Sequence, residues 1–235
     1  MKRIIFTGGN GRFGKIFKNI KHKDKIFFPT KRELNIENIK SIEKYIKKNK
    51  PKYFIHCAGL SRPMDIHTKS INKSIELNII ATSNIVKVCN NLNIKLIYFS
   101  TNYVYPGIKG EYREGSPVLP INNYALSKLG GECAVQMYKN SLILRICMTE
   151  KPFIHKKAFT DVDMNFMFHE DLAKNLLKLI DYRGILNVGG KTQSVYNFAK
   201  KNNKSVIKIL AKKIMGKHYP LKQSMNVYKY FKIIK

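Results

Sequence analysis

The chain has 235 residues, 44% of them hydrophobic, which is enough apolar material to fill the core of a globular protein. Its formal net charge is +29, from 44 lysines and arginines against 15 aspartates and glutamates. No apolar run approaches the roughly 18 residues of a membrane helix, and the N-terminus reaches Gly8 before a secretory segment could form. Four scattered cysteines without a CxxC pair indicate neither zinc nor disulfides. We therefore expect a cytoplasmic, metal-free protein with reduced thiols.

The positive charge is spread along the whole sequence rather than gathered in one arm or stripe. Such a charge attracts any polyanion, whether nucleic acid, a membrane surface or a nucleotide-linked substrate. No nucleic-acid recognition motif accompanies it. We expect no specific nucleic-acid partner and no membrane partner.

Short apolar runs alternate with longer amphipathic segments along the first part of the chain. The expected strands are residues 3–7, 26–28, 53–57, 96–100 and 142–146. The expected helices between them are residues 12–20, 36–49, 70–92 and 123–138. This alternation predicts βαβ units and therefore an α/β fold with a Rossmann-type, doubly wound parallel sheet.

The regular pattern changes after residue 146. The expected elements there are a loop-rich insertion at 149–168, a helix at 170–181, a strand at 185–188, helices at 194–201 and 205–215, and a basic tail. We therefore expect a Rossmann domain at residues 1–146. A small substrate-binding region at 147–235 would pack on it.

The first strand runs directly into a glycine-rich turn of the form GxxGxxG. Glycines permit a tight turn and close approach of a pyrophosphate, and the following helix N-terminus offers free N–H groups to the anion. The position of this turn between a strand and a helix indicates a dinucleotide site. The residues predicted to bind cofactor here are Gly8, Asn10, Gly11, Arg12, Phe13 and Gly14.

The second strand is followed by Thr30, Lys31 and Arg32, where NAD-binding proteins commonly place a carboxylate for the ribose hydroxyls. A hydroxyl and two cations suit a phosphate on that ribose instead. We expect NADP(H) to be preferred, with NAD(H) also open.

The third strand ends in His56, Cys57, Ala58 and Gly59, which resembles the Asn-Ala-Ala-Gly signature of short-chain dehydrogenases. The resemblance implies that Cys57, Ala58 and Gly59 lie against the adenine-ribose side of the cofactor. His56 replaces the usual amide, and packing is the interpretation we favour for it.

Two residues four positions apart, Tyr124 and Lys128, share one face of a predicted helix. A free tyrosine, with a pKa near 10, is a poor proton donor and acceptor at neutral pH. A cation at about 4 Å contributes roughly 4 kcal/mol at moderate dielectric, so a lysine here would lower the tyrosine pKa. Thr101, at the carboxyl end of the fourth strand, lies where open α/β sheets place their ligands.

The order of these motifs is that of the extended short-chain dehydrogenases, and the sequence resembles the dTDP-4-dehydrorhamnose reductase family in particular. The resemblance rests on Phe99 to Tyr105, Gly107, Tyr112-Arg113-Glu114, Pro117, Pro120, Asn123-Tyr124 and Lys128 to Glu132. It implies a catalytic triad of Thr101, Tyr124 and Lys128. It also implies that Asn78 supports a lysine-linked proton relay.

Two features depart from that family. Asn102 stands where the family usually has aspartate, and the segment between Arg145 and Asp171 is shorter than the usual sugar-binding region. Our leading hypothesis is an NADP-preferring reductase of a nucleotide-linked 4-keto sugar. Hydride would come from the nicotinamide and the proton from Tyr124. The partner would be the nucleotide sugar, and a homodimer is a possible assembly.

Two alternatives stay open. A nucleotide-sugar epimerase uses the same tyrosine and lysine but recycles its cofactor. A non-catalytic, NADP-binding regulatory subunit would resemble the reductase-like beta subunit of methionine adenosyltransferase in this family. A dehydratase is disfavoured, because Asn102-Tyr103 lacks the Asp-Glu pair that usually follows the threonine in those enzymes.

Overall fold

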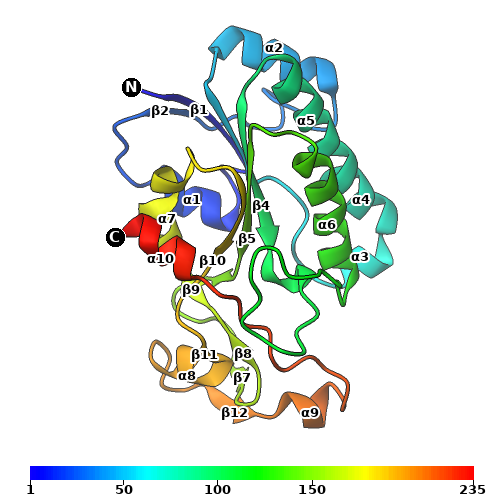
Figure 1. Ribbon diagram of the computed structural model, residues 1–235, viewed down its shortest axis with the longest axis vertical. Coiled ribbons are helices and arrows are strands. Elements are labelled where there is room, and N and C mark those ends of the chain that lie inside the picture. The colour runs from blue at the N-terminus through cyan, green and yellow to red at the C-terminus, as the bar shows by residue number, and fades with distance from the viewer.

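A six-stranded sheet forms the centre of the computed structural model, which describes residues 1–235 (Figure 1). Its strands are β1 (Arg3–Thr7), β2 (Lys25–Phe27), β3 (Tyr53–His56), β4 (Lys95–Thr101), β5 (Ser141–Ile146) and β10 (Gly184–Val188). All neighbours are parallel, in the order β10-β5-β4-β3-β1-β2. The order reverses direction between β1 and β3, which is where doubly wound sheets bind ligands. The predicted fold class is confirmed.

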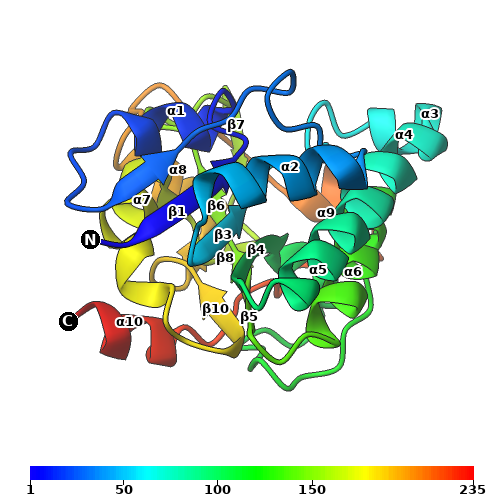
Figure 2. The ribbon, with the colours of Figure 1, turned by 90° about the horizontal axis from the view of Figure 1, so that it is seen from above.

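Helices cover both faces of this sheet (Figure 2). Phe17 of α1 (Arg12–Lys18), Leu176 of α7 (His169–Leu179) and Tyr230 of α10 (Tyr228–Ile234) share one apolar core. The other core joins α2 (Ile39–Asn49), α5 (Ala81–Asn91) and α6 (Asn123–Gln136) to the opposite face. Burial on both sides explains why the strands are continuous apolar runs without alternation.

The predicted helix over residues 70–92 is interrupted in the structure. It consists of α4 (Ile71–Ile75), a π-helical turn at Glu76–Ile80 and then α5, while a short α3 (Ile66–Lys69) precedes it. Turns of this kind occur mostly as single bulges and frequently lie at functional sites. Asn78 lies in the π-helical turn and is buried.

A smaller lobe is built from two separate stretches of the chain. The first holds β6 (Met148–Thr149), β7 (Lys157–Phe159), β8 (Asp163–Met164) and β9 (Met167–Phe168). The second holds β11 (Gln193–Ser194), α8 (Val195–Lys200), β12 (Ile207–Ile209) and α9 (Ala211–Ile214). Residues 169–188 and α10 return to the sheet, so the chain after residue 146 contributes to both lobes.

The helix predicted at residues 205–215 is wrong. Ile207 and Ile209 alternate with Lys208, and the segment pairs as β12 with β7 through a hydrogen bond from Ile207 N to Lys156 O at 2.9 Å. Only Ala211–Ile214 is helical. The expected basic tail ends in a helix, α10, which buries Tyr230. No helix of the chain combines the length and apolar character needed to cross a membrane.

Candidate active site

A cavity of about 700 Å³ lies between the carboxyl edge of the sheet and the small lobe. The large domain contributes Arg12, Ser100, Thr101, Asn102 and Tyr124 to its wall. The small lobe contributes Phe153, Phe159, Val162, Met164, Phe166 and Tyr219. The small lobe thus supplies many apolar side chains, although His155, Lys156 and Lys157 also line the cavity. A mostly apolar lining with a few polar groups is usual in small-molecule sites.

Thr101 and Tyr124 lie together in this cavity. Thr101 ends β4 and is 4% exposed, while Tyr124 lies in the first turn of α6. That helix begins here because the side chain of Asn122 accepts a hydrogen bond from Ala125 N at 2.8 Å. Burial raises the pKa of Tyr124 to about 12, although a hydrogen bond with Thr101 and the charge of Arg12 act to lower it. The phenol is therefore protonated at neutral pH.

Lys128 lies one helical turn after Tyr124 but outside the cavity lining. Its ammonium is 4.1 Å from the centre of the Tyr98 ring. Burial lowers the pKa of Lys128 to about 8, opposed by Cys57 and Glu132. The expected lowering of the Tyr124 pKa by Lys128 is not seen, because burial of the phenol dominates and the opposing charges come from arginines.

Asn78 holds the loop after β3 against α6. Its amide accepts from Leu60 N at 2.8 Å and donates to Leu60 O at 2.9 Å and to Ser127 Oγ at 2.8 Å. A Cβ on Gly59 would lie 2.8 Å from the Asn78 oxygen and 4.0 Å from the Lys128 nitrogen. The predicted residues Gly59, Asn78 and Lys128 are thus close together, beside the cavity rather than in its wall.

The glycine-rich turn has the tight backbone that its sequence predicts. Gly8 has a φ of +85°, and a Cβ there would lie 2.8 Å from Ala58 N. A Cβ on Gly14 would lie 2.1 Å from Gly8 O, so only glycine fits at either position. Gly11 precedes α1 as its N-cap and donates its N–H to Gly8 O at 2.9 Å. A ligand can therefore approach the exposed backbone of Gly11 closely.

The three side chains predicted to bind cofactor in this turn have different surroundings. Asn10 is exposed, and Arg12 reaches the main cavity. Phe13 is buried and packs with Phe17 at 6.0 Å between ring centroids, so only its backbone can face a ligand.

The loop after β2 holds an acid that the sequence interpretation missed. Thr30 donates its N–H and its hydroxyl to the Glu33 carboxylate at 2.8 and 2.9 Å, and Lys31 pairs with Glu37 at 2.5 Å. Thr30 and Glu33 have the spacing of a capping box, a signal that could have identified this contact. Arg32 makes no ion pair.

His56 is a packing residue, as predicted. It is 1% exposed, and its two ring nitrogens contact the hydroxyls of Thr7 at 3.0 Å and Thr82 at 3.1 Å. Burial lowers the pKa of His56 to about 3, so the ring stays neutral.

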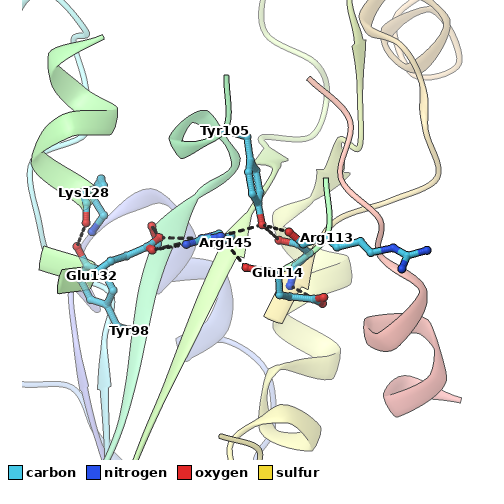
Figure 3. A network of polar contacts seen from close by, with 9 residues as sticks. Tyr98, Tyr105, Arg113, Glu114, Lys128, Glu132 and Arg145 are labelled. Carbon is cyan, nitrogen blue, oxygen red and sulfur yellow. Dashed lines mark hydrogen bonds and ion pairs between the residues drawn. The ribbon is translucent and has the colours of Figure 1, made fainter. Parts of the chain in front are cut away.

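A buried ionic network supports the strand that carries Thr101 (Figure 3). Glu132 of α6 pairs with Arg145 of β5 at 2.9 Å, with side chains 0% and 3% exposed. Glu132 also accepts a hydrogen bond from Ser100, the residue before Thr101. Arg145 donates to Tyr105 Oη at 2.9 Å and to Glu114 O at 3.2 Å. The network links β4, β5 and α6 directly behind the cavity.

Several residues at the cavity were not predicted. Asn102 was noted only as a departure, yet it is buried and its Nδ2 has no hydrogen-bond partner, so it is available to a ligand. Arg62, Glu150 and His169 also line the cavity. No spacing in the sequence relates these residues to one another, because they come from segments that follow different strands.

Known protein families and solved structures were compared with this chain, and both agree with the fold described above. The family model described as "RmlD substrate binding domain" matches residues 1–164. A dTDP-4-dehydrorhamnose reductase from Bacillus anthracis, solved in complex with NADP, superposes with a TM-score of 0.85 at 22% identity, covering 98% of this chain and 92% of that one. That likeness concerns the fold.

Two relatives by sequence carry different descriptions. Methionine adenosyltransferase 2 subunit beta from Xenopus laevis is 32% identical over 155 residues, 62% of this chain and 46% of that protein. A dTDP-4-keto-6-deoxy-D-glucose reductase from Streptomyces niveus is 25% identical over 136 residues, 57% of this chain and 47% of that protein. The chain thus spans less than half the length of these relatives. Since the family model covers more than half of the sequence, the chain belongs to the RmlD substrate-binding-domain family.

Proposed function

We propose that this protein is an NADP-preferring reductase of a nucleotide-linked 4-keto sugar. The observation that carries the proposal is the meeting of Thr101 and Tyr124 in one cavity at the carboxyl edge of the sheet. The Streptomyces niveus relative and the Bacillus anthracis structure, both described as reductases of such sugars, support it.

The residues fit a dinucleotide. A Cβ at Gly8 or Gly14 would fill the turn that a pyrophosphate must approach, and the adjacent start of α1 offers free N–H groups. The cofactor site would comprise Gly8, Asn10, Gly11, Arg12, Phe13, Gly14, Thr30, Lys31, Arg32, Cys57, Ala58, Gly59, Asn78, Tyr124 and Lys128. When bound, the nicotinamide supplies the hydride that reduces the sugar carbonyl carbon.

The chain's own groups handle the carbonyl oxygen and the proton. Thr101 Oγ1 would donate a hydrogen bond that orients the carbonyl oxygen. Tyr124 would donate its phenolic proton to that oxygen, giving the alcohol, and a pKa of about 12 keeps this proton in place until it is needed. Lys128 would bind the ribose and help to replace the proton. The apolar wall of the small lobe, within residues 147–235, would exclude water around the sugar.

Cofactor preference can be tested at the loop after β2. We expect NADPH to bind more tightly than NADH, because Lys31 and Arg32 can pair with the ribose phosphate. The double variant Lys31→Ala/Arg32→Ala should bring the two affinities together, as measured by fluorescence titration. Glu33→Gln is the matched control, since it removes the acid beside Thr30 and should widen the preference. Equal affinities for both cofactors in the wild type would contradict the assignment.

Lys128 offers a test with a pH signature. Lys128→Met should weaken NADPH binding and lower turnover together, because one ammonium is assigned to both ribose and proton supply. Its pKa of about 8 predicts that wild-type affinity falls as the pH rises through that value and the ammonium loses its proton. The variant should bind weakly at every pH. If the NADPH affinity of the wild type does not change between pH 7 and 9, this role of Lys128 is ruled out.

The function itself is tested with a panel of 4-keto nucleotide sugars incubated with NADPH or NADH, followed by product identification. A reductase consumes one cofactor per sugar reduced. An epimerase converts nucleotide sugars without net consumption. Failure of every sugar to react, with cofactor binding intact, would remove the reductase proposal.

A non-catalytic regulatory subunit is the second candidate. It is favoured by the 32% identity to methionine adenosyltransferase 2 subunit beta. The presence of Thr101 and Tyr124 in one cavity, with Lys128 beside it, argues for chemistry instead. NADPH binding without turnover on the sugar panel would favour the regulatory function.

A further inference from the structure

Two arginines converge on a single carboxylate oxygen at the mouth of the cavity. Arg12 Nη1 donates to Glu150 Oε1 at 2.8 Å, and Arg62 Nη1 donates to the same oxygen at 3.0 Å. Arg12 also donates to Ser61 Oγ at 3.1 Å. Arg12 begins α1, Ser61 and Arg62 follow β3, and Glu150 follows β6, and all of them line the cavity.

The arrangement leaves an excess of positive charge and of hydrogen-bond donors. Burial raises the pKa of Glu150, but a backbone hydrogen bond and the two guanidiniums outweigh it and hold the pKa below its usual value, so the carboxylate is charged. One carboxylate neutralises only one of the two cations. A guanidinium group can donate two parallel hydrogen bonds to phosphate oxygens. A diphosphate carries more negative charge and more acceptor atoms than a carboxylate.

A further polar atom beside this ion cluster has no partner. His169 is 5% exposed and lines the same cavity, and its Nδ1 makes no hydrogen bond. Its ring meets that of Phe13 edge-on, with 5.9 Å between the ring centroids. A buried polar atom without a partner requires an explanation, and a ligand atom bound beside it would supply one.

We propose that Arg12 and Arg62 form a diphosphate-binding site, and that the Glu150 carboxylate occupies this site until a diphosphate displaces it. The inference rests on the proposed function, in which two ligands contain a diphosphate. One is the dinucleotide and the other is the nucleotide sugar. Arg62 and Glu150 thereby gain roles in ligand binding that the sequence did not predict. Glu150 acts as a competing anion built into the chain.

A diphosphate must break the ion pairs of Glu150 before it binds, and a substitution can remove this free-energy cost. Glu150→Gln keeps the shape of the side chain and takes away its charge, so the guanidiniums are released to the ligand. Because exposed ion pairs of this kind are individually weak, freeing both guanidiniums should raise the affinity for a diphosphate roughly two- to thirtyfold. Arg62→Gln should lower the affinity, since half of the site is lost.

The experiment is a calorimetric titration of wild type, Glu150→Gln and Arg62→Gln with inorganic pyrophosphate, NADPH and dTDP at one ionic strength. Glu43→Gln is the control, because it removes the same charge on α2, where Glu43 makes no ion pair. We expect Glu150→Gln to bind pyrophosphate more tightly than the control, and Arg62→Gln to bind it more weakly. The ligand, NADPH or dTDP, whose affinity changes in the variants in the same direction as that of pyrophosphate is the one whose diphosphate binds at this site.

The proposal is overturned if Glu150→Gln binds all three ligands no more tightly than Glu43→Gln does. It is also overturned if Arg62→Gln binds all three as well as the wild type. These are binding measurements without turnover. A protein that reduces no ketosugar would defeat the proposed function while leaving this result unchanged, so the two failures are distinguishable.

Discussion

Replacing Tyr124 by phenylalanine is expected to lower the rate of ketosugar reduction by roughly 10²-fold or more, the scale on which a positioned general acid acts. The substitution removes only the hydroxyl. The ring can keep its contact with His67, whose centroid lies 5.1 Å away. Thermal stability should stay close to that of the wild type. NADPH affinity should fall only slightly, because this hydroxyl is one of many groups assigned to the cofactor, so the main loss should fall on kcat.

The measurement is NADPH oxidation with the ketosugar that the wild type reduces, followed with titration of NADPH alone. Tyr228→Phe serves as the control, because this tyrosine is 71% exposed on α10, away from the cavity. A Tyr124→Phe variant that retains the full rate would show that the proton comes from another group.

Replacing Glu132 by glutamine is expected to destabilise the protein by about 3–5 kcal/mol, the cost of breaking a buried ion pair from one side. The Arg145 guanidinium would remain buried with its charge uncompensated, while its contacts with Tyr105 and the Glu114 carbonyl persist. Chemical denaturation should show a lower midpoint with an unchanged slope.

A second variant separates charge from packing. Glu132→Leu/Arg145→Met removes both charges and should recover part of the stability lost in Glu132→Gln. Glu43→Gln should leave the unfolding free energy within about 0.5 kcal/mol of the wild type, as expected of a surface change. A loss below about 1 kcal/mol in Glu132→Gln would mean that water or a neighbour compensates Arg145.

The central sheet was predictable because its signals are local. Burial on both faces makes β1, β4 and β5 short apolar runs, and the bounds of all six predicted strands are correct to within one residue at each end. The glycine turn and the pair Tyr124 and Lys128 depend on spacing within one element, which a sequence displays directly.

The small lobe and the cavity wall depend on contacts between distant segments. Val206, Leu210 and Ile214 recur at helical spacing, yet residues 207–209 form a strand because they pair with β7, some 50 positions earlier. Arg12 and Glu150 are 138 positions apart, so nothing in the sequence relates them. The raised pKa of Tyr124 follows from burial of the phenol, while the prediction considered only the lysine on the same helix.

The small lobe is built from two separate stretches of the chain, and this limits how the specificity of the cavity can be changed. The cavity wall takes Phe153 to Phe166 from one stretch and Val195 and Tyr219 from another, with a helix and a strand of the sheet between them. Exchanging a loop of the first stretch alone with that of a relative would leave Val195 and Tyr219 unmatched. The second stretch lies outside the part of the chain that the family model covers. Directed changes in specificity should therefore begin there and be paired with changes at residues 153–166.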